Sequence, residues 1–195
     1  RIDAIREPFR DHIDDLLVGD TLHLYEFNQG LLNRKTITIV KEGDRAEAKL
    51  WVDNVKIISS IKTDDKGKRV QIGRATFLYS SLDEVLGQAE VLLKKHGRPP
   101  SLLIISDGKD TEKDGQFRDM AAVLKKHDAT FKKLPSKIFC AIVEFNLGPI
   151  REAFVGGGGT VAVAVKDGDD PDAAPTLEKI FKLINIVADF ATSLP

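Results

Sequence analysis

Short apolar runs alternate with stretches of helical periodicity over the second half of this chain. The runs predict strands over 101–106, 137–145 and 160–165, and the periodic stretches predict helices from Leu82, through Phe117 to Leu124, around 148–155 and from Leu177 to Ala188. Strands that are apolar on both faces are typical of a parallel sheet covered by helices on both sides. We therefore expect an α/β fold with an open, mainly parallel sheet.

The first half of the chain is less regular. It predicts, in order, an amphipathic helix over 2–17 containing Pro8, a strand over 21–28, an edge-like strand over 35–40, a helix or a strand over 46–61, and a flexible charged loop over 62–73. For 46–61 we favour a helix. The 195 residues fit a single domain, residues 1–195.

Composition narrows the classes of function. A formal net charge of -1 provides no basic field for nucleic acid, and no apolar stretch is long enough to cross a bilayer. Cys140, the single cysteine, excludes a disulfide within the chain, and its place in an apolar run predicts burial. A cytoplasmic protein is the simplest interpretation, although an excised extracellular domain would have the same composition.

Polar residues follow the apolar strand 101–106. Ser106 ends the strand, Asp107 follows it directly, and Gly108 allows the backbone to turn. In open α/β sheets, ligands bind outside the carboxyl ends of the strands. Asp107 therefore either holds a ligand or only caps the loop that follows.

Other motifs are weaker. The run Gly156–Gly159 lacks the spacing of a dinucleotide or phosphate loop, which favours a turn in tight quarters over a phosphate cradle. The acidic stretch 167–172 lacks the order of a calcium-binding loop, and the four histidines lack zinc or triad spacing. No nucleophile is paired with a base in the sequence, so we expect no enzymatic activity. Ser81 to Glu84 has the form of a capping box, which places a helix start at Leu82.

Three segments resemble the von Willebrand factor A family. "GRATFLYSSL" (73–82) is similar to that family's loop threonine segment, and it precedes "SDG" (106–108) by about the family's spacing. "RIDAIREPFRDHIDDLLVGDTLHLYEFN" (1–28) resembles the family's first helix and second strand, and "FVGGGGTVAVAV" (154–165) resembles the turn before its last strand. The resemblance covers most of the chain and implies the same α/β fold.

The resemblance also implies a metal-ion-dependent adhesion site. Thr76 matches the family's loop threonine and Asp107 its distant aspartate, which would hold Mg²⁺ or Mn²⁺, while Ser106, Gly108 and Lys109 would shape the rim that meets the partner. A protein partner would complete the metal site with an acidic side chain. Hard cations prefer such oxygen ligands.

The family's Asp-x-Ser-x-Ser motif and its first strand do not occur in the sequence, so we expect that about 15 to 20 residues precede Arg1 in the complete domain. Two alternatives remain open. One is a domain of the same fold that binds partners without metal. The other is a nucleotide- or phosphate-handling α/β enzyme that uses the glycine-rich turn.

Overall fold

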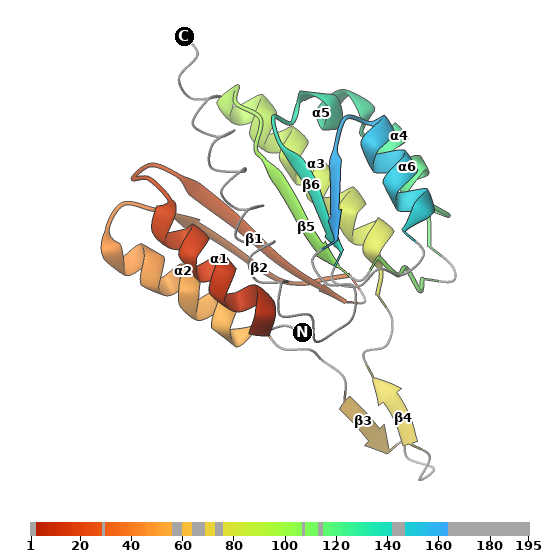
Figure 1. Ribbon diagram of the computed structural model, residues 1–195, viewed down its shortest axis with the longest axis horizontal. Coiled ribbons are helices and arrows are strands. Elements are labelled where there is room, and N and C mark those ends of the chain that lie inside the picture. The colour runs from red at the N-terminus through yellow and green to blue at the C-terminus, as the bar shows by residue number, and fades with distance from the viewer. Residues whose placement is uncertain are drawn as a thin grey trace.

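The computed structural model describes residues 3–28, 30–55, 60–63, 69–72, 76–106, 108–112, 115–141 and 147–163. Its helices are α1 (Asp3–Asp15), α2 (Glu42–Asn54), α3 (Leu78–His96), α4 (Met120–Lys126), α5 (Asp128–Lys133) and α6 (Gly148–Gly156). Its strands are β1 (Thr21–Asn28), β2 (Gly30–Thr38), β3 (Ser60–Thr63), β4 (Arg69–Ile72), β5 (Leu102–Ser106), β6 (Lys137–Ala141) and β7 (Thr160–Val163). The fold is therefore mixed α/β, as the sequence predicts (Figure 1).

The described strands form three separate hydrogen-bonded groups. β5, β6 and β7 make a parallel sheet in that order, so the parallel pairing predicted for the second half of the chain is confirmed. β1 pairs with β2 in an antiparallel hairpin, and β3 pairs with β4 in another. In the parallel sheet, β6 is buried from Ile138 to Ala141, and alternate residues of β5, Leu102, Ile104 and Ser106, are buried as well.

The β1–β2 hairpin has helices on both faces. Leu24 belongs to a buried cluster with residues of α1 and α2, whereas Phe27 packs against a cluster that includes residues of α3. Successive side chains of a strand point to opposite faces, so the two residues mark the two sides of β1. The predicted strand over 21–28, with apolar residues on both faces and helices covering both, is confirmed.

The buried cluster against which Phe27 packs joins α3, α4 and α6 to the parallel sheet. Three phenylalanines lie at its centre, with the Phe154 ring edge-on to Phe131 and Phe139 at centroid distances of 5.1 and 5.9 Å. The glycine-rich turn packs directly on these rings, because a Cβ on Gly157 would lie 2.7 Å from Phe131 and one on Gly159 would lie 2.4 Å from Phe154. The turn in tight quarters predicted for Gly156–Gly159 is confirmed.

Several predicted boundaries are wrong. β2 begins at Gly30 rather than at residue 35, because a tight connection lets the hairpin pair along its whole length. The favoured helix over 46–61 ends at Asn54, with β3 starting at Ser60, and the charged segment 62–73 includes part of the β3–β4 hairpin instead of being a loop throughout. Predicted structure over 142–145 and beyond residue 163 lies outside the described residues.

The predicted starts of two helices are also wrong. α3 begins one turn earlier than Leu82, so Ser81 lies inside it, is only 3% exposed and caps nothing. α4 begins at Met120 rather than near Phe117, because the Asp119 carboxylate accepts a hydrogen bond from the Ala122 N–H and caps it there. Gly97, with φ of 69°, ends α3 in the left-handed conformation that glycine readily adopts.

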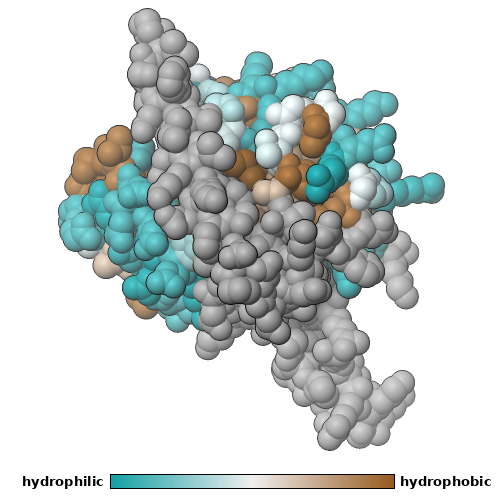
Figure 2. All heavy atoms as spheres, viewed as in Figure 1, coloured by the Kyte–Doolittle hydropathy of each residue, from teal (hydrophilic) through white to brown (hydrophobic). Residues whose placement is uncertain are grey.

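Among the described residues that are coloured on the face shown in Figure 2, hydrophilic ones predominate. Figure 2 shows smaller apolar patches on this face, and the exposed large apolar side chains of the described residues include Leu17, Val18 and Val40 in the loops beside α1 and β2. Within the part of the chain that the structure describes, each helix is too short or too polar to cross a bilayer.

Candidate functional site

The carboxyl ends of β1 and β5 meet at the start of α3. The Asn28 carbonyl at the end of β1 accepts a hydrogen bond of 2.6 Å from the Phe77 N–H. One residue earlier, Thr76 makes three hydrogen bonds with Thr111 in the loop after β5. The Thr76 N–H donates to the Thr111 hydroxyl at 2.7 Å, and the Thr76 carbonyl accepts from the Thr111 N–H at 2.8 Å and from the Thr111 hydroxyl at 3.4 Å. These bonds join three segments that are far apart in sequence into one loop cluster.

The loop after β5 also caps α3. The Asp110 carboxylate accepts a hydrogen bond of 2.8 Å from the Leu78 N–H, and the Ser80 hydroxyl donates to the Glu112 carboxylate. Free N–H groups in the first turn of a helix need such acceptors. Burial raises the pKa of Asp110 above its ordinary value, with Glu112 adding to the rise and backbone N–H donors opposing it.

The turn after β5 depends on glycine. Gly108 has φ of +77°, and a Cβ there would lie 2.7 Å from the Leu147 side chain. Its N–H donates to the hydroxyl of Ser106, which is 6% exposed. The left-handed conformation strains any larger residue at this position, and the Leu147 side chain would also have to move, so the sharp turn predicted from the sequence is confirmed.

The structure brings together most residues that the sequence proposed for a site. Thr76 is half-buried and bonds to the segment that follows Gly108, and Lys109 is exposed beside it. Ser106 lies beneath the turn rather than on its surface, so it supports the rim from below. Asp107 lies outside the described residues.

Three contributors were missed in the sequence: Asp110, Thr111 and Glu112. Their signal is a polar run directly after an apolar strand, which marks a strand-end loop. Asp110 and Glu112 contact residues of α3 that lie 32 positions away in the sequence. Capping patterns that can be read from a sequence span only about three residues, so they do not indicate these contacts.

The described residues of the loop cluster do not by themselves fit a divalent cation. The Ser106 hydroxyl accepts a hydrogen bond from the Gly108 N–H, and the Glu112 carboxylate accepts one from the Ser80 hydroxyl. The Asp110 carboxylate accepts one from the Leu78 N–H at the start of α3. Across the described part of the chain, no group of three or more His, Cys, Asp or Glu residues is placed to hold a metal ion. Mg²⁺ favours a near-octahedral set of oxygens, including one or two carboxylates.

We expect Asp110→Ala to lower the free energy of unfolding by about 1 kcal/mol, because the Leu78 N–H loses its acceptor. Asp110→Asn keeps an oxygen acceptor and removes a charge that burial disfavours, so its stability should stay within about 0.5 kcal/mol of wild type. Urea unfolding at neutral pH measures both. Equal losses in the two variants would show that the charge matters more than the capping bond.

Comparison with protein-family models and with curated protein sequences finds no match.

Proposed function

We propose that this protein is a protein-binding module and that its binding face is the loop cluster at the carboxyl ends of β1 and β5. The observation that supports this most is the interlocking of Thr76 and Thr111, which holds two strand-end loops together beside the exposed Lys109. Loops fixed by a rigid scaffold are common binding surfaces. A cation on this rim favours a partner with an acidic side chain.

The chemistry of the described residues favours binding over catalysis. Cys140 is fully buried in β6, and burial raises the pKa of its thiol to about 12, so it is not a thiolate nucleophile at neutral pH. The buried His127 ring lies 2.8 Å from the Asp83 carboxylate, which also pairs with Lys126. This hydrogen-bonded pair joins α3 to the start of α5. The enzyme alternative used the glycine-rich turn to hold a phosphate, but the close packing of Gly157 on Phe131 and of Gly159 on Phe154 gives these glycines a structural reason instead.

We also propose that the fold is an open, Rossmann-like sheet of the von Willebrand A type, in which the β1–β2 hairpin continues the parallel sheet beyond β5. Shared loops support this arrangement, because the end of β1 and the loop after β5 are both bonded to the segment 76–77. β1 and β5 therefore end on the same side of the molecule.

Selection of displayed random peptides on the immobilised protein tests the binding face. We expect enriched peptides to be acidic and to bind Lys109→Glu at least about tenfold more weakly, since charge reversal on the rim replaces attraction by repulsion. Lys95→Glu is the matched control, because Lys95 is an exposed lysine at the other end of α3. Peptides that bind both variants as they bind wild type would place the binding face elsewhere.

The metal-dependent form of this proposal takes Thr76 and Asp107 as two ligands of Mg²⁺ or Mn²⁺. We expect isothermal titration of the 195-residue chain with either ion to give no saturable heat at millimolar concentration, since two ligands are too few. Asp107→Ala should behave identically. Saturable heat in wild type that disappears in Asp107→Ala would instead establish the metal site.

A further inference from the structure

One threonine hydroxyl helps to hold the loop cluster together. The Thr111 hydroxyl accepts a hydrogen bond of 2.7 Å from the Thr76 N–H and donates one of 3.4 Å to the Thr76 carbonyl. Thr111 is nevertheless an exposed residue, so its hydroxyl lies at the surface while its partner belongs to the backbone of another loop. A covalent change on this hydroxyl would therefore act on the contact between the two loops.

The residues around Thr111 form a pattern of carboxylates. Asp110 precedes Thr111, Glu112 follows it directly, and Asp114 follows it three positions later. Acidic residues at the first and third positions after a hydroxyl are the substrate pattern of acid-directed serine/threonine kinases, because basic side chains in the substrate groove of such a kinase attract these carboxylates. The sequence around Thr111 fits that groove.

The structure distinguishes Thr111 from the other hydroxyls with a similar pattern. Ser80 and Ser81 are also followed three positions later by a carboxylate, at Asp83 and Glu84. Both serines lie inside α3, where the backbone is held in a helix, and Ser81 is only 3% exposed. Thr111 lies in the loop after β5 and is exposed. A kinase groove requires an accessible segment outside a helix, so the structure favours Thr111.

A phosphate on Thr111 would meet negative charges that already influence one another. Burial and, in addition, Glu112 raise the pKa of Asp110 above its ordinary value. A phosphate brings about two further negative charges at neutral pH, which the neighbouring Asp110 and Glu112 carboxylates repel. Esterification also removes the hydroxyl proton, so Thr111 loses the bond that it donates to the Thr76 carbonyl. Both effects act against the contact between the two loops.

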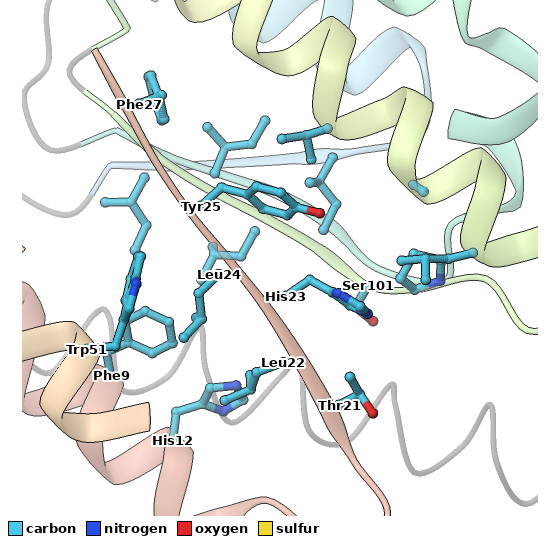
Figure 3. A pocket seen from close by; sticks show the side chains of 18 of the residues that line it. Phe9, His12, Thr21, Leu22, His23, Leu24, Tyr25, Phe27, Trp51 and Ser101 are labelled. Carbon is cyan, nitrogen blue, oxygen red and sulfur yellow. The ribbon is translucent and has the colours of Figure 1, made fainter. Parts of the chain in front are cut away.

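The loop cluster is separate from the cavity inside the protein. A space of about 440 Å³ lies between the two buried clusters, with Phe9, Leu24 and Trp51 among the side chains around it (Figure 3). Thr76 and Thr111 are not among the described residues that line this space. A change in their contact therefore alters the loops without opening the core, so the modified protein should remain folded.

We propose that Thr111 is a phosphorylation site for an acid-directed serine/threonine kinase, and that its phosphorylation separates the two loops and weakens binding at the loop cluster. In this reaction the Thr111 Oγ1 attacks the γ-phosphorus of Mg²⁺-bound ATP. The new O–P bond forms as the bond from that phosphorus to ADP breaks, and the hydroxyl proton passes to the catalytic aspartate of the kinase.

The effect on binding rests on the proposed function, whereas the modification and the separation of the loops do not. Lys109 is the cation that the acidic partner of the proposed function would contact, and it lies two residues before Thr111. A phosphate beside Lys109 offsets its charge and repels an acidic side chain. Phosphorylation should therefore act on binding in the same direction as Lys109→Glu.

Purified casein kinase II with Mg²⁺ and ATP tests the modification on the 195-residue protein. We expect intact-mass measurement to show one added phosphate on wild type, on Thr111→Ser and on the control Ser80→Ala. Thr111→Val keeps the shape of the side chain without its hydroxyl, so it should accept none. No phosphate on wild type, or an equal amount on Thr111→Val, would overturn the proposal.

Amide hydrogen exchange of the phosphorylated protein tests the separation of the loops. Exchange at the Thr76 N–H should become at least about tenfold faster, because this group loses its bond to the Thr111 hydroxyl. The Gly97 N–H is the control, since it donates to the Leu93 carbonyl at the other end of α3 and should exchange at an unchanged rate. Unchanged exchange at Thr76 would contradict the proposal.

The acidic peptides selected on the unmodified protein test the effect on binding. They should bind the phosphorylated protein at least about tenfold more weakly, and equal affinity for both forms would overturn this part of the proposal. If the selection yields no acidic peptide, the proposed function fails instead. The intact mass and the exchange at Thr76 then still decide whether Thr111 is modified and whether the loops separate, so the two proposals fail distinguishably.

Discussion

Phe154→Ala is expected to lower the free energy of unfolding by about 3–5 kcal/mol, the usual cost of removing a buried aromatic ring. Phe154 is fully buried, its ring is edge-on to Phe131 and Phe139, and the backbone of Gly159 folds over it with a hydrogen bond of 2.8 Å to its carbonyl. The truncation leaves a cavity under the turn that leads into β7. The total free energy of unfolding of a domain is about 5–15 kcal/mol, so the variant should unfold at a much lower urea concentration than wild type.

Val155→Ala is the matched control for this measurement. Val155 is the next residue along α6 and is 52% exposed, so its truncation should change stability by about 0.5 kcal/mol or less. Phe154→Leu should lie between the two, because it keeps most of the apolar volume. A loss below about 1 kcal/mol in Phe154→Ala would contradict the packing described for this core.

We expect the protein to lose about 2 kcal/mol of stability between pH 7.5 and pH 5 through His12 alone. Burial of the His12 ring lowers its pKa from 6.5 to about 4, although Asp15 and Asp20 act in the opposite direction. The folded-state pKa lies below the unfolded-state pKa. The neutral ring therefore contributes stability that is present above pH 6.5 and is lost as the pH falls toward 4, since only the unfolded chain takes up the proton.

Urea unfolding at several pH values in this range measures the effect. His12→Gln cannot titrate, so its free energy of unfolding should change by about 2 kcal/mol less than that of wild type over the same interval. If the free energy of unfolding depends on pH in His12→Gln as it does in wild type, His12 takes up its proton in the folded protein as readily as in the unfolded chain.

The candidate site was predictable in part. Ser106 and Gly108 follow from the sequence because a polar residue or a glycine at the end of an apolar strand marks a strand-end loop, whereas Thr76 and Lys109 are implied by the resemblance to the von Willebrand factor A family. The contacts that join these loops were not predictable. The pairing of Thr76 with Thr111 and the capping of Leu78 by Asp110 connect residues that are 35 and 32 positions apart, and nothing in the local pattern of either segment indicates its partner.

The sequence by itself determined the element types over most of the chain, because helical and strand periodicities report which side chains each segment buries. It also determined the end of α3 at Gly97 and the tight glycine turn, since backbone conformation and side-chain size are local properties. Only the tertiary structure decided that α3 starts at Leu78 and that the strands divide into separate groups with a cavity between β1 and β5. The physical reason is that caps and strand neighbours are distant hydrogen-bond partners, which exist only once the elements pack.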